Sequence, residues 1–174
     1  MIDSEIMVGT GLRITVPKDE LAARLATVAR GVSTRTTVLV LGGIQLRAEA
    51  GRLHLAATDM EVSLRASLDA QVADEGVVVV PGRLLLDIAR SLPEGEVTIE
   101  HKPEEAVVVV SAGSAMYRLH TYSNEDFPRL PEIDDATLNA IEREALVETI
   151  SRVGRSASRD ESRPVLTGIL VRFE

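Results

Sequence analysis

The alternation of apolar and polar positions predicts a strand and then a helix near the start of the chain. Residues 12–17 (LRITVP) alternate as a half-buried strand does. Pro17 ends the strand and fits the first turn of a helix. Residues 18–31 then place apolar side chains at helical spacing, and Gly31 is the predicted stop. The apolar face of this helix consists of Leu21, Leu25 and Val28.

Strand-like runs follow this helix, so the first unit has the order βαβββ. The runs cover residues 39–47, 53–58 and 62–68, with polar or glycine-containing breaks between them. The same order then recurs. Residues 77–97 (VVVVPGRLLLDIARSLPEGEV) again contain a strand, a proline, a short helix and a stop. Three more predicted strands complete the second unit, at residues 96–101, 106–111 and 115–121.

A third copy of the pattern begins after a proline-bearing stretch. Leu146, Ile150 and Val153 repeat the apolar spacing of the first helix, and Leu166–Ile169 (LTGI) repeats Leu41–Ile44 (LGGI) at the same shift. This copy is predicted to stop after its second strand. We therefore expect four segments: a leader at 1–11, a complete domain at 12–124, a linker at 125–135 and the first part of a second domain at 136–174.

These patterns predict an α+β fold of repeated βαβββ units, with two helices packed on antiparallel sheets in each complete domain. Hydrophobic residues make up 45% of the chain and aromatic residues only 2%, so the core must consist of Val, Leu, Ile and Ala. Cysteine is absent, which excludes disulfides and thiolate metal sites. With no signal-peptide pattern and no apolar run of about 20 residues, we expect a cytoplasmic protein without membrane contact.

The distribution of charge matters more than its sum. A formal net charge of −8 argues against nucleic-acid binding, because DNA affinity depends largely on phosphate neutralisation. Steps of about 100° per residue nevertheless place arginine on the solvent face of every predicted helix. Asp87 shares one such face, while most carboxylates lie elsewhere. The arginines are Arg24, Arg30, Arg83, Arg90, Arg152 and Arg155.

Two interpretations of these arginines remain open. Exposed helix faces are often charged, and arginine is common on them. Alternatively, a positive face on an acidic body attracts phosphate without reading base sequence. No aromatic stacking platform lies on the helices, which disfavours single-strand binding. The four aromatic residues are Tyr117, Tyr122, Phe127 and Phe173.

Four stretches, in this order, resemble the bacterial DNA polymerase III β subunit, the β sliding clamp family: ATDMEVSL, the 77–97 segment, YSNEDFPRLPE and DESRPVLTGILV. The resemblance implies the DNA-clamp fold of three similar domains. Two subunits join into a homodimeric ring around double-stranded DNA, with helices lining the hole. Such a ring tethers the DNA polymerase III catalytic subunit, is opened by the clamp loader, catalyses no reaction and holds no cofactor or metal.

The resemblance also assigns residues. Arg35 matches an arginine that contacts DNA from the loop after the first helix. In the loop after the third helix, Asp160 stands where the family has a DNA-contacting polar side chain, which shifts the expectation to Arg159 or Arg163. Part of the family's partner pocket matches Arg163, Leu166 and Thr167. The strands that would form the subunit interface contain Val108, Val110 and Tyr117.

Two other functional classes compete with this interpretation. For an enzyme, Asp59 and Glu61 are the best candidates as a carboxylate pair, but a pair at a loop end is more often solvated. No phosphate-binding Gly-Lys-Ser/Thr motif and no HExxH motif occurs, and the three histidines are isolated. The second alternative is a β-rich protein-interaction module that does not encircle DNA.

Overall fold

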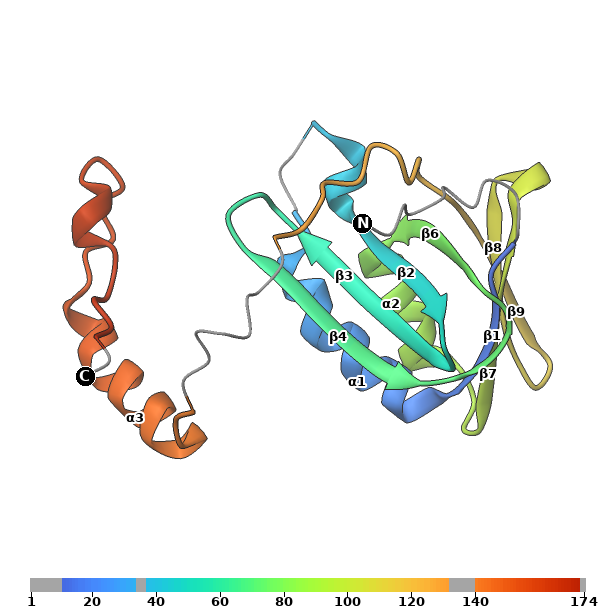
Figure 1. Ribbon diagram of the computed structural model, residues 1–174, viewed down its shortest axis with the longest axis horizontal. Helices are drawn as coiled ribbons and strands as arrows, with labels where there is room; N and C mark the ends of the chain where they lie inside the picture. The colour runs from blue at the N-terminus through green and yellow to red at the C-terminus, as the bar shows by residue number, and fades with distance from the viewer. Residues whose placement is uncertain (1–10, 34–36, 132–139, 173–174) are drawn as a thin grey trace, which may run out of the picture. The chain divides into compact units, whose positions relative to one another are not determined.

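The computed structural model describes residues 11–33, 37–131 and 140–172. The chain divides into an N-terminal unit, Met1–Leu130, and a C-terminal unit, Pro131–Glu174. None of the helices in the described residues is long and apolar enough to cross a membrane. The N-terminal unit (Figure 1) contains β1 (Arg13–Pro17), α1 (Lys18–Val28), β2 (Gly43–Glu49), β3 (Arg52–Thr58), β4 (Ser63–Asp69), β5 (Gln71–Asp74), β6 (Gly76–Pro81), α2 (Gly82–Ser91), β7 (Glu96–Lys102), β8 (Val107–Ala112) and β9 (Ala115–His120).

The strands form two antiparallel sheets, as predicted. One sheet has the order β5-β1-β7-β8-β9 and the other β4-β3-β2-β6. The first strand of each repeat therefore pairs with the other repeat: β1 joins β7, and β6 joins β2. This exchange interlocks the two repeats, so neither can complete its hydrogen bonding without the other.

A single core lies between the two helices and the two sheets. The predicted face of α1, formed by Leu21, Leu25 and Val28, is fully buried. α1 and α2 also pack against each other. Burying each such side chain contributes roughly 1.5–3 kcal/mol to the stability of the fold, so the apolar face of α1 holds this helix on the sheets. The buried face of α2 consists of Leu85, Ile88 and Ala89, and Leu92, directly after the helix, is buried with them.

Several element boundaries differ from the predictions. Pro17 and Pro81 precede the helices as cap residues rather than lying in the first turn. The predicted strand 39–47 begins as a 3-10 turn over Leu39–Gly42, where the Leu41 N–H donates to the Val38 carbonyl. Strand β5 was not predicted. Its sequence, QVAD, has only four residues, two of them apolar, and the strand forms by pairing with β1 at the edge of the five-stranded sheet.

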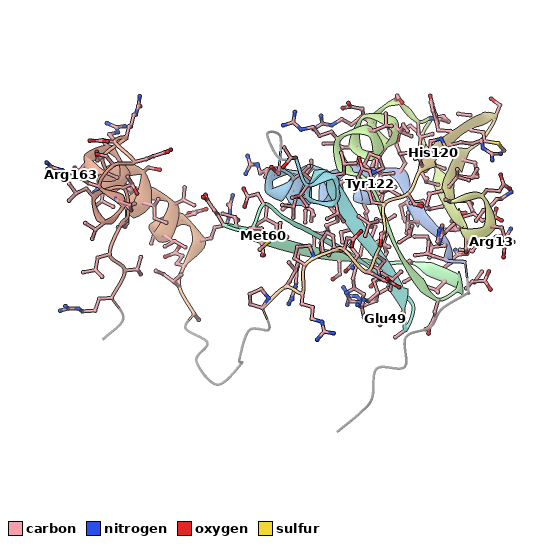
Figure 2. All side chains as sticks on the ribbon, turned by 90° about the horizontal axis from the view of Figure 1, so that it is seen from above. Arg13, Glu49, Met60, His120, Tyr122 and Arg163 are labelled. Carbon is pink, nitrogen blue, oxygen red and sulfur yellow. The ribbon has the colours of Figure 1, made fainter. Side chains whose placement is uncertain are left out.

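The turn between β3 and β4 is organised by Asp59. Its carboxylate accepts hydrogen bonds from the backbone N–H groups of Glu61, at 3.0 Å, and Val62, at 2.8 Å. These two bonds hold the pKa of Asp59 below its usual range. The turn also contains Met60 with φ +78°, a left-handed conformation that is uncommon outside glycine. Figure 2 shows Met60 just after β3 and Glu49 at the far end of the hairpin, where it ends β2 opposite Arg52. Asp59 is therefore a structural acceptor, which explains this residue without a catalytic role.

Replacing Asp59 by alanine is expected to lower the melting temperature at pH 7, because two backbone N–H groups lose their acceptor. Since the folded-state pKa is depressed, the ionised carboxylate stabilises the fold above the unfolded pKa, and this contribution is lost as the pH falls through the folded pKa. The difference between wild type and Asp59→Ala should thus shrink below about pH 4. Thermal circular dichroism from neutral to acid pH measures this. A constant difference over that range would contradict it.

Residues 122–130 form a strap across the four-stranded sheet, on the face opposite the main core (Figure 1). The strap begins where the Tyr122 N–H donates to the Val79 carbonyl, at 2.8 Å. Phe127 is only 7% exposed. The strap ends where the Arg65 guanidinium donates to the Leu130 carbonyl, at 3.0 Å. The compact unit thus extends beyond the predicted boundary at 124, and residues 125–130 are not a free linker. The cluster under the strap consists of Val40, Leu41, Val79 and Phe127.

The C-terminal unit, taken by itself, repeats the helical part of the first repeat. Its helix α3 (Arg143–Val153) begins and ends 125 residues after α1. The 3-10 turn Gly154–Ser156 follows α3 as Ala29–Gly31 follows α1. Within residues 140–172 the structure has no strand, so the expectation that the third copy contains strands there is wrong. A lone segment of this kind has no neighbour to accept and donate its ladder hydrogen bonds.

Candidate nucleic-acid interface

The outer faces of α1 and α2 carry four arginines. Arg24 lies in α1, Arg30 in the 3-10 turn that extends it, and Arg83 and Arg90 in α2. All four side chains are exposed, whereas the opposite face of each helix is buried in the core. Because the two helices pack together, the arginines belong to one helical layer. Their exposure agrees with the helical spacing, and their contact with DNA stays a prediction.

These four arginines have no carboxylate partner among the described residues, and the other Lys and Arg side chains of the unit divide equally between paired and unpaired. None of the ion pairs among the described residues involves them, while four other Lys and Arg side chains of the unit are paired. The unpaired basic side chains outside the helices lie on strands or on the segment after β9, and they are Arg13, Arg65, Lys102 and Arg129. The paired groups are Lys18 with Glu94, Arg47 with Glu49, Arg52 with Asp69, and Arg118 with Glu105.

Exposed carboxylates concentrate on the strands and loops. A guanidinium without a partner keeps its full attraction for phosphate, whereas a paired one is largely neutralised locally. The helical layer is therefore the cationic face of an otherwise acidic unit. Asp87 on α2 and Asp19 and Glu20 on α1 are the exposed carboxylates within the two helices. The exposed carboxylates outside them include Asp69, Asp74, Glu75, Glu94, Glu96, Glu104 and Glu105.

The other predicted DNA contacts fall in the C-terminal unit or outside the described residues. Arg152, Arg155 and Arg159 are all exposed. Arg152 forms an (i, i+4) ion pair with Glu148 on α3, so its charge is partly offset. Arg35 lies outside the described residues. The structure therefore brings together only the arginines of α1, its 3-10 extension and α2.

An apolar groove of about 680 Å³ lies in the C-terminal unit. Leu166 lines this groove, but Arg163 and Thr167 do not, although all three are exposed. The groove exists because the apolar face of α3 is open: Ile150 and Val153 are each 43% exposed. Of the three residues assigned to the partner pocket, Leu166 alone lines this groove, and a role of the three in partner binding stays a prediction.

The expected subunit-interface residues divide into two groups. Tyr117 lies on β9, the edge strand of the five-stranded sheet, and is 37% exposed. Val108 and Val110 lie on the inner strand β8 and are fully buried in the core. Their side chains cannot contact a second subunit in the folded unit, so this part of the expectation is corrected. Edge pairing remains available to the backbone of β9.

The remaining candidates for catalysis or metal binding have structural explanations. Asp59 is engaged by its own turn, as described above. Burial lowers the pKa of His101, whose Nδ1 is buried without a hydrogen-bond partner. In the part of the chain that the structure describes, no three His, Asp or Glu side chains are grouped so that they could hold a metal ion.

Comparison with known proteins decides the family. Residues 12–131 match the family model of the DNA polymerase III beta subunit, N-terminal domain. The chain belongs to this family. The beta sliding clamp of Streptomyces coelicolor is 40% identical over 94% of the chain, and that of Micrococcus luteus is 37% identical over the same share.

The family's solved structures share the fold described above. The DNA polymerase sliding clamp from Caulobacter crescentus superposes with a TM-score of 0.84 at 28% identity, covering 90% of this chain and 43% of that one. The sliding clamp from Bacillus subtilis also gives a TM-score of 0.84, at 26% identity. The chain spans about half of the curated relatives it matches, 43% of the Streptomyces clamp and 52% of the Micrococcus clamp. The predicted α+β clamp fold is thus confirmed.

Proposed function

We propose that this chain is the N-terminal portion of a replicative sliding clamp, a non-catalytic factor that keeps the DNA polymerase III catalytic subunit on double-stranded DNA in the bacterial cytoplasm. The observation that carries the proposal is the set of exposed arginines on α1, its 3-10 extension and α2, none of which forms an ion pair with another described residue. A clamp needs attraction to the phosphate backbone without base readout. Arginines on a helical surface, with no aromatic residue among them, supply that.

The two sheets fit the outer wall of such a clamp. Their exposed carboxylates repel DNA, so duplex is favoured only on the helical face. The open edge of β9 offers backbone groups for pairing with another subunit, as closure of a homodimeric ring requires. The clamp loader and the polymerase subunit are the partners that this function implies, and no cofactor takes part.

Duplex binding by the 174-residue chain tests the proposal. We expect weak, sequence-independent binding that falls by up to about 100-fold between roughly 50 and 200 mM salt if all four arginines contact phosphate. Fluorescence anisotropy with a labelled duplex measures the affinity. Replacing Arg24, Arg30, Arg83 and Arg90 together by glutamine should remove most of it.

The matched control replaces Arg13, Arg47, Arg52 and Arg129 by glutamine. It changes the net charge equally but leaves the helical layer intact, so binding should stay near the wild-type level. Equal losses in both variants, or no loss in the helix variant, would contradict the assignment. Unchanged binding without the helix arginines would favour the alternative of a β-rich interaction module. We expect no polymerase or nuclease turnover from any of these proteins.

A further inference from the structure

Asp87 places a negative charge within the arginine surface of α2. It follows Arg83 by four residues and precedes Arg90 by three. At about 100° per residue, the three side chains lie within about 60° of arc on the helix. A rise of about 1.5 Å per residue places Asp87 within about 6 Å of each arginine along the axis. All three residues are exposed.

The Asp87 carboxylate does not neutralise either arginine. Among the described residues it forms no ion pair or hydrogen bond, although both spacings allow helix neighbours to meet. On α3, by contrast, Glu148 pairs with Arg152 at the (i, i+4) spacing. On α3 the acidic residue precedes the basic one by four positions, which is the favourable orientation, whereas on α2 Arg83 precedes Asp87. Aspartate also has a shorter side chain than glutamate.

We propose that Asp87 limits the affinity of the helical layer for DNA. The screening length of about 10 Å at 0.1 M salt exceeds the axial spacing of roughly 6 Å between Asp87 and each arginine, so screening leaves its charge felt by a phosphate bound there. Asp87 therefore repels the same phosphates that those arginines attract. The consequence is a looser hold on the duplex, which suits a protein that must move along DNA. This inference rests on the proposed function, since it requires DNA at the outer face of α2.

An isosteric charge removal tests the inference. Asp87→Asn should bind a labelled duplex about two- to fivefold more tightly than wild type near 100 mM salt, with a steeper dependence on salt concentration. Asp87→Glu keeps the charge and should bind like wild type. The matched control is Asp74→Asn, because Asp74 is also exposed but lies on β5 at the edge of a sheet.

The outcomes separate this inference from the proposed function. Tighter binding by Asp87→Asn alone supports both. Wild-type affinity in Asp87→Asn, or equal gains in Asp87→Asn and Asp74→Asn, would overturn the role of Asp87 while leaving duplex binding in place. Absence of salt-sensitive duplex binding in wild type and all variants at about 50 mM salt would overturn the proposed function, and the role of Asp87 with it.

Discussion

Replacing Leu25 by alanine is expected to destabilise the N-terminal unit by about 2–5 kcal/mol, whereas Ile150→Ala should cost far less. The two residues occupy equivalent positions, because α3 repeats α1 at a shift of 125 residues. Leu25 is fully buried, and its truncation would leave a cavity among the helices and sheets. Ile150 is 43% exposed on an open face, so its truncation removes little buried area and leaves no closed cavity.

Hydrogen exchange of peptides from α1 and α3, combined with urea unfolding of the whole chain, measures both effects. Peptides from α1 should lose protection in Leu25→Ala and keep it in Ile150→Ala. A cost below about 1 kcal/mol at Leu25 would contradict the core assignment. Strong protection of α3 that Ile150→Ala abolishes would show that the apolar face of α3 is covered.

This pair of positions also shows what the sequence could predict. Apolar spacing alone identified the buried faces of α1 and α2, since helical periodicity is a local property. The same spacing predicted a buried face on α3, which the structure leaves half open. Burial depends on the partner as well as on the pattern. α1 has α2 and two sheets against it, and the described part of the C-terminal unit contains neither.

The exchange of first strands between repeats could not be predicted for a related reason. Alternation in β1 shows that one face is buried but does not say which strand lies beside it. The family resemblance assigned Val108 and Val110 to the subunit interface, and the valine run of β8 could not test that assignment because it has no alternation. Val107 and Val109 are 5% and 8% exposed, and Val108 and Val110 are fully buried, so no valine is marked as outward-facing.

For the arginines of α1, its 3-10 extension and α2, the sequence predicted exposure but not ion pairing. Helical spacing correctly placed Arg24, Arg30, Arg83 and Arg90 on exposed surfaces. It could not reveal that they lack carboxylate partners while Arg47 and Arg52 have them, because those pairs depend on cross-strand neighbours and hairpin geometry. The contact of Arg65 with the Leu130 carbonyl could not be predicted either, because it joins residues 65 positions apart.

Phe127→Ala is expected to lower the free energy of unfolding of the N-terminal unit by about 3 kcal/mol. A segment rich in proline and charge favours a linker interpretation, but Phe127 is buried against Val40, Leu41 and Val79. This aromatic side chain was the available signal that the segment is docked. Because small domains are stable by only about 5–15 kcal/mol, such a loss is a large share of the total.

Equilibrium urea unfolding measures the loss, and Phe127→Leu is the matched control, since leucine keeps most of the apolar contact and should cost about half as much or less. Hydrogen exchange locates the effect. The Tyr122 N–H, which donates to Val79, should exchange faster in Phe127→Ala than in wild type. Wild-type stability and exchange in Phe127→Ala would mean that residues 125–130 behave as the linker that their composition predicts. The expected loss would agree with a docked strap, whose last residue, Leu130, is held by the Arg65 guanidinium and ends the N-terminal unit.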